Sequence, residues 1–222
     1  EAAALPLTAL TAWEAFADRL GILPHAPAGG AAKSVLIIGG AGGVGSIATQ
    51  LAKRVFGLRV IATAGREESA AWCRQMGADL IADRRLPLKA ALEQAGAGKV
   101  EYILCLNSTE VYLPQMADVI QPQGRICSIV RAKDNQPLPL NLFFDLSVSF
   151  SWEYMFTRPV RQTPDMHAQH AILAEVSRLV DAGVLRTTMR ESLGVLGPET
   201  LRTAHQRLEA GETIGKLTLS GM

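Results

Sequence analysis

The chain has 222 residues, of which 48% are hydrophobic and 19% are charged, and its formal net charge is +1. Such a chain can form one large domain with a sizeable core. Binding to nucleic acid requires a clustered basic excess, so the near-neutral charge and scattered Lys and Arg argue against a nucleic-acid partner or an anionic membrane. The sequence shows no signal peptide and no apolar run of about 18 residues, so we expect a cytoplasmic protein without a membrane span.

Three cysteines, Cys73, Cys105 and Cys127, lie in apolar surroundings and lack metal-binding spacing. An odd number of cysteines is a poor disulfide framework. We therefore expect buried, reduced thiols, as in a cytosolic protein.

Strands and helices are predicted to alternate along most of the chain. A helical period covers residues 5–20, and a loop with turn residues follows at 25–30. The next segments predict strands at 34–38, 59–64, 80–82, 102–106 and 124–130, separated by helices that end near Gly57 or cover 67–76, 87–95 and 111–120. This alternation predicts an α/β fold, a doubly wound parallel (Rossmann) sheet with helices on both faces.

The second half of the sequence is less regular. A polar, proline-bearing loop at 133–139 precedes a predicted strand at 148–156. Two amphipathic helices at 166–182 and 198–210 and a last strand at 216–219 complete the prediction.

A glycine cluster follows the apolar run Val35–Ile38 and opens an amphipathic helix. Gly40, Gly42 and Gly45 form G-x-G-x-x-G at this strand-to-helix junction, the setting that the dinucleotide-binding fingerprint requires. We expect Gly40 to turn the chain, Gly42 to let the backbone approach a pyrophosphate and Gly45 to let the helix pack closely. The N-terminus of the helix then offers free N–H groups and a positive dipole end to phosphates.

The end of the second predicted strand indicates which dinucleotide is bound. An NAD site usually places Asp or Glu there to accept from the ribose 2′-OH, but this chain has Ala64-Gly65-Arg66. A guanidinium suits a 2′-phosphate, so we predict NADPH, with Gly65 and Arg66 at the phosphate. In the alternative interpretation, Arg66 is a solvated cation and Glu67 or Glu68 serves the ribose.

These features resemble the medium-chain dehydrogenase/reductase superfamily, in the branch of quinone oxidoreductases and zinc-type alcohol dehydrogenase-like proteins. The resemblance covers nearly the whole chain, in the segments LPLTALTAWEAF, GGAGGVGSIATQLAK, VIATAGREESAAWCRQMGAD, YILCLN, QPQGRICSIV, FSWEYMFTRP and IGKLTL. It implies a first helix and loop at 1–30, an NADP-binding Rossmann domain at 31–190 and a carboxy-terminal helix and strand at 191–222. The resemblance also implies that these residues do not include the family's amino-terminal GroES-like domain.

The resemblance also implies contacts between particular residues and the cofactor. It places Gly42, Gly43 and Val44 at the pyrophosphate, Cys105, Leu106 and Asn107 at the nicotinamide ribose, Ile129 and Val130 at the carboxamide, and Thr11 and Lys216 beside the cofactor. Cys105 could equally be a core thiol, and Lys216 could be only a surface cation.

One departure from the zinc-dependent members concerns the metal. Their catalytic zinc ligand is a Cys four residues before the Thr that matches Thr11, and this chain has Leu7 there. An aliphatic side chain cannot ligate zinc, so the sequence resembles the zinc-free reductases. His167 and His170 could share a helix face, but no third ligand accompanies them, and a solvated helix end is the simpler explanation.

The resemblance implies hydride transfer from NADPH to a quinone, enone or carbonyl compound, with no catalytic residue identifiable and no turnover by this fragment alone. It also implies a homodimer through the sheet edge. A non-catalytic NADPH-binding or RNA-binding relative is the alternative. A short-chain dehydrogenase needs Tyr-x-x-x-Lys, which the chain lacks, and a methyltransferase usually has an acidic residue after the second strand.

Overall fold

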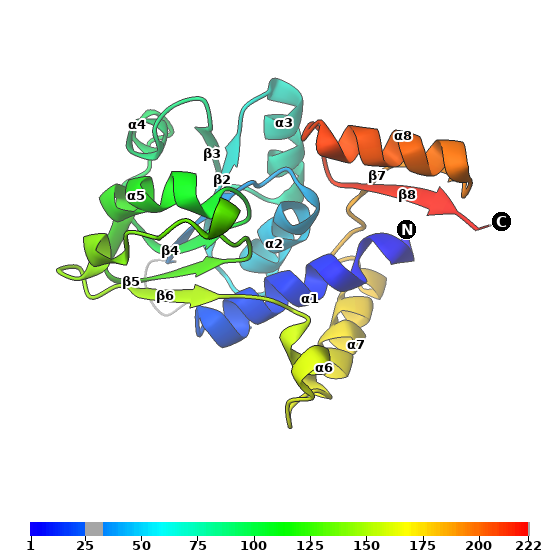
Figure 1. Ribbon diagram of the computed structural model, residues 1–222, viewed down its shortest axis with the longest axis horizontal. Coiled ribbons are helices and arrows are strands. Elements are labelled where there is room, and N and C mark those ends of the chain that lie inside the picture. The colour runs from blue at the N-terminus through cyan, green and yellow to red at the C-terminus, as the bar shows by residue number, and fades with distance from the viewer. Residues whose placement is uncertain (25–32, 222) are drawn as a thin grey trace.

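Six parallel strands in the order β3-β2-β1-β4-β5-β6 form the central sheet of the computed structural model (Figure 1). The structure describes residues 1–24 and 33–221, so the loop predicted at 25–30 lies outside the described residues. The strands of the sheet are β1 Ser34–Ile38, β2 Arg59–Ala64, β3 Leu80–Asp83, β4 Val100–Cys105, β5 Ile120–Ser128 and β6 Ser149–Trp152. This order is that of a doubly wound Rossmann sheet, which confirms the predicted fold class.

Helices cover both faces of the sheet. The helices are α1 Pro6–Glu14, α2 Gly43–Arg54, α3 Glu67–Met76, α4 Leu88–Gln94, α5 Thr109–Val119, α6 Thr157–Arg161, α7 Ala168–Asp181 and α8 Pro198–Glu209. Short turns of helix occupy Ala2–Ala4, Ala15–Arg19, Lys133–Asn135 and Leu140–Phe143. In the part of the chain that the structure describes, no helix has the length and apolarity needed to cross a membrane.

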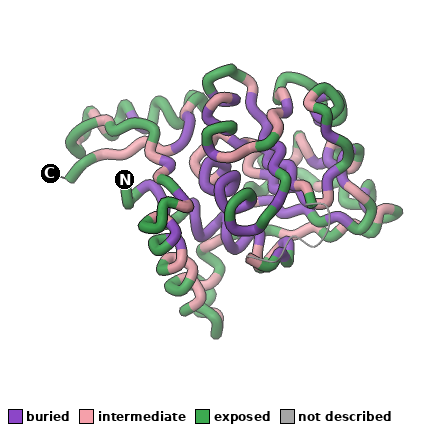
Figure 2. The backbone as a smooth tube through the Cα atoms, turned by 180° about the vertical axis from the view of Figure 1, so that it is seen from behind, coloured by how far each residue is buried: buried purple, intermediate pink, exposed green. Residues whose placement is uncertain are grey.

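The side chains of β1 alternate between two cores. Val35 and Ile37 pack with α1, α2 and α7 on one face, whereas Leu36 and Ile38 pack with α4 and α5 on the other. All four are fully buried, as expected for a strand of a parallel sheet that helices cover on both sides. The sheet and its adjoining helix faces therefore form the buried centre seen in Figure 2.

A second, two-stranded sheet was not predicted in full. The predicted last strand is β8 (Lys216–Ser220), and it pairs in parallel with β7 (Met189–Val195), whose sequence MRESLGV shows no apolar alternation. Most of β7 is exposed, so burial imposes no pattern on its side chains. Together with α8, the two strands form an arm beside the main sheet (Figure 1).

Other elements also differ from the prediction in their extent, among them β5, which was predicted at 124–130 and spans Ile120–Ser128. The first helix, predicted over 5–20, changes after Glu14 into a wider π-turn in which the Leu20 amide donates to the Ala15 carbonyl at 2.9 Å. The strand predicted at 148–156 is confined to β6, at the outer edge of the sheet. The homodimer through this edge stays a prediction.

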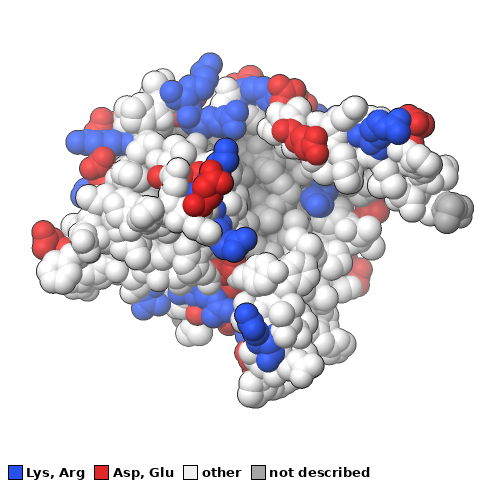
Figure 3. Space-filling model, in the orientation of Figure 1, with Lys and Arg blue, Asp and Glu red and all other residues white. Residues whose placement is uncertain are grey.

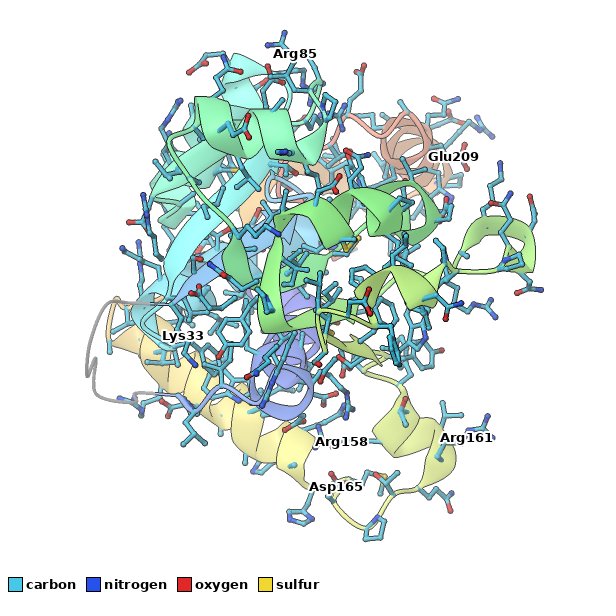
Figure 4. The ribbon with its side chains drawn as sticks, turned by 90° about the vertical axis from the view of Figure 1, so that its left-hand side faces the viewer. Lys33, Arg85, Arg158, Arg161, Asp165 and Glu209 are labelled. Carbon is cyan, nitrogen blue, oxygen red and sulfur yellow. The ribbon has the colours of Figure 1, made fainter. Side chains whose placement is uncertain are left out.

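A cluster of charged side chains joins the first helix to the segment after β6. Glu14 and Glu153 are buried carboxylates, and Arg158 lies 2.7 Å from Glu14 Oε1. Arg19 Nε donates to Glu153 Oε2 at 2.8 Å, whereas Glu153 Oε1 is buried without a hydrogen-bond partner among the described residues. Arg158 also contacts Asp165, at the turn from α6 to α7 (Figure 4).

The pKa of Glu153 is raised to about 7, chiefly by burial. The neighbouring Glu14 carboxylate also raises this pKa, and Arg19 lowers it by less. A carboxyl group whose pKa is higher in the folded state favours folding when it is protonated. Its contribution is therefore fully present below the unfolded value near 4.5 and is lost as the pH rises toward 7. Above pH 7, two buried carboxylates face each other.

We expect Glu153→Gln to remove this pH dependence, because an amide keeps the shape and can accept from Arg19 without carrying a charge. The variant should exceed the wild type in free energy of unfolding by about 1 to 3 kcal/mol at pH 8. Below pH 5.5 the two proteins should differ little. Urea denaturation between pH 5 and 8.5 measures this, with the exposed Glu209→Gln as control; equal pH profiles for wild type and Glu153→Gln would contradict it.

Candidate functional site

A pocket of about 310 Å³ opens where the strand order reverses between β1 and β4. In open α/β sheets, this crevice at the carboxyl ends of the strands is where ligands bind. Figure 3 shows a hollow in this face, with basic and acidic side chains around it. The lining residues come from the ends of β1 to β5 and the turns and helices that follow them, and from the segment before β8: they are Gly39, Ala41, Gly42, Gly43, Val44, Gly45, Thr63, Ala64, Gly65, Arg66, Ser69, Arg84, Leu106, Asn107, Tyr112, Ile129, Gly211, Thr213 and Ile214.

The glycine loop forms the floor of the pocket, and its glycines have different roles. The left-handed backbone lies at Gly39, with φ 92°, so the chain turns there and not at Gly40 as expected. Gly40 instead packs against β2 and α3, since a Cβ there would lie 2.7 Å from the Ala62 methyl. A Cβ at Gly45 would strike the carbonyl oxygens of Gly39 and Gly40, so Gly45 lets α2 begin directly on the loop.

Gly42 is the N-cap of α2 and faces open space, because a Cβ there would meet only the Gly39 carbonyl at 3.5 Å. Free N–H groups at the start of α2 and its positive dipole end therefore lie at the pocket. This arrangement suits a phosphate group.

The segment before β8 forms one wall of the pocket and holds the glycine loop. The Gly215 amide donates to the Ala41 carbonyl at 2.8 Å. The aliphatic part of Lys216 packs on Gly43, where a Cβ would lie 2.6 Å from Lys216 Cδ. Lys216 thus lies against the loop, although it does not line the pocket; its contact with a cofactor stays a prediction.

Two arginines that line the pocket follow the neighbouring strands β2 and β3. Arg66 Nη2 donates to the Glu212 carbonyl at 2.5 Å, which leaves its other guanidinium donors available. Arg84 lies against Gly65, where a Cβ would be 2.6 Å from Arg84 Nε. The sequence analysis missed Arg84, although its position after β3 was a usable signal, because β3 ends beside β2.

None of the described residues that line this pocket is acidic. Glu67 pairs with Arg74, and Glu68 pairs with Arg190 on the arm. Neither glutamate lines the pocket in this structure.

Some of the remaining predicted residues line the pocket, and others do not. Leu106, Asn107 and Ile129 line it, whereas Cys105 is completely buried. The Thr11 hydroxyl donates to the Leu7 carbonyl within the first helix at 2.8 Å, and Thr11 does not line the pocket.

Val130 lines a second pocket of about 850 Å³ at the ends of β5 and β6. Ile129 borders both pockets, and Trp152, Glu153 and Tyr154 line the second. This space is more apolar than the first and adjoins it at Ile129.

The three thiols are free and buried, as expected. Burial raises the pKa of Cys73 and Cys127 to about 12 and that of Cys105 to about 11. These thiols stay neutral near pH 7, so they fit a packing role and not that of a nucleophile or metal ligand.

The residues that the structure describes contain no group of three His, Cys, Asp or Glu that could hold a metal ion. Leu7, at the position of a zinc ligand in zinc-dependent relatives, is a half-exposed aliphatic side chain. His167 and His170 lie at the exposed start of α7. The described part of this chain therefore does not fit a zinc site.

The strand order and the glycine loop at its reversal define a Rossmann domain. Residues 76–219 match the family described as zinc-binding dehydrogenase. The chain therefore belongs to the medium-chain dehydrogenase/reductase superfamily, in its zinc-type alcohol dehydrogenase-like branch.

Similar proteins cover this chain almost completely. A zinc-type alcohol dehydrogenase-like protein of Staphylococcus aureus (strain MSSA476), SAS2087, is 43% identical over 99% of the chain and 64% of its own length. The crystal structure of a candidate zinc-dependent alcohol dehydrogenase from Rhizobium etli CFN 42 is 44% identical, with a TM-score of 0.90 over 99% of this chain and 63% of that one. An NAD-dependent alcohol dehydrogenase structure is 27% identical, with a TM-score of 0.79 over 98% and 57% of the two chains. The chain thus spans about two thirds of the length of its relatives.

Alanine substitutions in the glycine loop should distinguish Gly45, where close packing requires a glycine, from Gly42, where a methyl group has room. Gly45→Ala forces a methyl into two backbone carbonyls and should lower the free energy of unfolding by about 2 to 3 kcal/mol. Gly42→Ala meets ordinary contact at φ −73°, so its stability should stay within about 0.5 kcal/mol of wild type. Urea denaturation compares the two; equal losses would contradict the assigned roles.

Proposed function

We propose that this chain is the NADP(H)-binding domain of an oxidoreductase that transfers a hydride to a quinone, enone or carbonyl substrate. Two arginines, one after β2 and one after β3, support the choice of NADP(H). Arg66 and Arg84 line the pocket, none of whose described lining residues is acidic, whereas an NAD site would place a carboxylate at the end of β2. Guanidinium groups offer bidentate donors to a 2′-phosphate dianion.

The residues present suit the rest of the dinucleotide. The N-terminus of α2 and the open Gly42 would hold the pyrophosphate, and Lys216 lies beside them at Gly43. Leu106, Asn107 and Ile129 would border the nicotinamide ribose and ring. When bound, NADPH would supply a hydride to an electrophilic carbon of the substrate.

The second pocket is the proposed place for part of the substrate, because it adjoins the first at Ile129 and contains Trp152 and Tyr154. Its apolar lining suits an unsaturated or aromatic compound and would help exclude water. The chain's own contribution is to bind the cofactor, orient it toward this pocket and shield the reacting carbon.

Alanine substitution of either arginine should reduce the preference for NADPH. Loss of a charge-assisted contact predicts about 10- to 100-fold weaker NADPH binding, with NADH binding changed by less than about threefold. Isothermal titration of wild type, Arg66→Ala and Arg84→Ala with both cofactors measures this. Arg85→Ala is the matched control, because Arg85 pairs with Asp83 and projects outward (Figure 4).

If Arg66→Ala and Arg84→Ala keep the full preference for NADPH, the assignment of the 2′-phosphate site is wrong. If the wild type prefers NADH, the cofactor assignment is wrong.

Catalysis should require more than these 222 residues, because one side of the second pocket is open in this chain and its relatives are longer. With 1,4-naphthoquinone or an alkenal, we expect NADPH oxidation by the chain alone to stay at the background rate. A longer form that includes the rest of the relatives' length should turn over. A robust rate from the 222 residues would contradict this division, and no turnover by the longer form across a broad carbonyl panel would favour a non-catalytic binder.

A further inference from the structure

The segment after β5 is fastened at two points to the neighbouring strand-end loop. The Ile129 amide donates to the Cys105 carbonyl at 3.2 Å. The Thr109 hydroxyl, at the first residue of α5, donates to the Val130 carbonyl at 2.5 Å. Thr109 thus holds the carbonyl of the Val130–Arg131 peptide, next to Ile129, which lines both pockets.

The buried hydroxyl of Ser128 fixes the direction of the hydrogen bond that the Thr109 hydroxyl makes. Thr109 and Ser128 are both completely buried, and their hydroxyl oxygens are 2.5 Å apart. A hydroxyl has one proton to donate, and a carbonyl can only accept. Since Thr109 gives its proton to Val130, the proton between the two hydroxyls comes from Ser128. The Cys105 carbonyl is a second acceptor for Ser128 but lies farther away, at 3.4 Å, so the shorter contact gives the order Ser128 to Thr109 to the Val130 carbonyl.

The peptide between these two points, Ile129–Val130, has unused hydrogen-bonding groups. Neither the Ile129 carbonyl nor the Val130 amide has a hydrogen-bond partner among residues 1–24 and 33–221. The peptide is trans, so its carbonyl and its amide point in opposite directions. A carboxamide both donates and accepts, so whichever of the two groups faces the junction of the pockets can bind it. Their positions depend on how firmly the segment after β5 is held.

We propose that Thr109 is a positioning residue, which sets the Ile129–Val130 peptide to receive the carboxamide of the nicotinamide ring. The inference rests on the proposed function, since it takes the ring to lie at Ile129. Thr109 itself does not line either pocket and so acts only through the backbone that it holds.

Two ligands that differ in the nicotinamide half test the proposal. NADPH contains this half, and adenosine 2′,5′-bisphosphate contains only the part that Arg66 and Arg84 would bind. Isothermal titration gives both affinities for the wild type, Thr109→Val, Thr109→Ser and Ser128→Ala, and circular dichroism monitors the fold.

Thr109→Val keeps the shape but removes the hydroxyl, so NADPH should bind about 5- to 20-fold more weakly, with affinity for the bisphosphate within about twofold of wild type. Thr109→Ser keeps the hydroxyl and should restore most of the loss. Ser128→Ala removes only the outer hydroxyl and should cause a smaller loss, again confined to NADPH. Thr49→Val is the control, because Thr49 is equally buried but its hydroxyl has no partner among the described residues.

Equal weakening of both ligands by Thr109→Val and Ser128→Ala would overturn the proposal in favour of a merely structural role, and so would unchanged NADPH binding. If Thr109→Val does not fold, the NADPH-specific loss in Ser128→Ala decides between the two. Binding of the bisphosphate as tightly as NADPH by the wild type would also overturn it, while the adenosine side of the proposed function would stand. If the wild type binds neither ligand, the proposed function itself fails, and this inference fails with it.

Discussion

The close approach of α2 to the glycine loop is the constraint on which the pocket depends. Gly45 lies against the carbonyls of Gly39 and Gly40, so the first turn of the helix begins where the strand ends. Any side chain at Gly45 would push the helix away and move its free N–H groups off the floor of the pocket. The loop's shape in turn decides where the Gly215 amide and the Lys216 stem can pack.

The pocket brings together segments that are far apart in the chain. Arg66 and Arg84 come from adjacent strand ends, while the carbonyl of Glu212 holds the Arg66 guanidinium from the carboxy-terminal side. That partner is a neutral backbone group and does not compensate the charge of Arg66, and neither Arg66 nor Arg84 forms an ion pair with another described residue. This distinguishes them from the arginines of the surface, such as Arg85 and Arg207, which face carboxylates.

Local sequence patterns predicted the fold and the centre of the site because the underlying physics is local. Burial of β1 on both faces imposes a continuous apolar run, and a tight strand-to-helix turn imposes its glycines. The strand β7 could not be predicted, since its pairing with β8 involves exposed residues that carry no periodicity. The relay from Ser128 through Thr109 was likewise hidden, because it depends on the register of β4 against β5 and not on neighbours in sequence.

The two buried glutamates illustrate the same limit. Nothing near Glu14 or Glu153 in the sequence indicates that the two carboxylates meet, because the first helix and β6 come together only through the folded sheet.

The buried thiols have a consequence for following the protein's motions. Cys127 lies in the core under α1, α2 and α7, Cys105 in the opposite core under α4 and α5, and Cys73 between α3 and β2. Each thiol is shielded from solvent and protonated near pH 7, so a maleimide can reach it only when its own layer opens. The rates at which the three sites become labelled therefore report separately on the opening of the two faces and of the edge of the sheet, with no engineered probe.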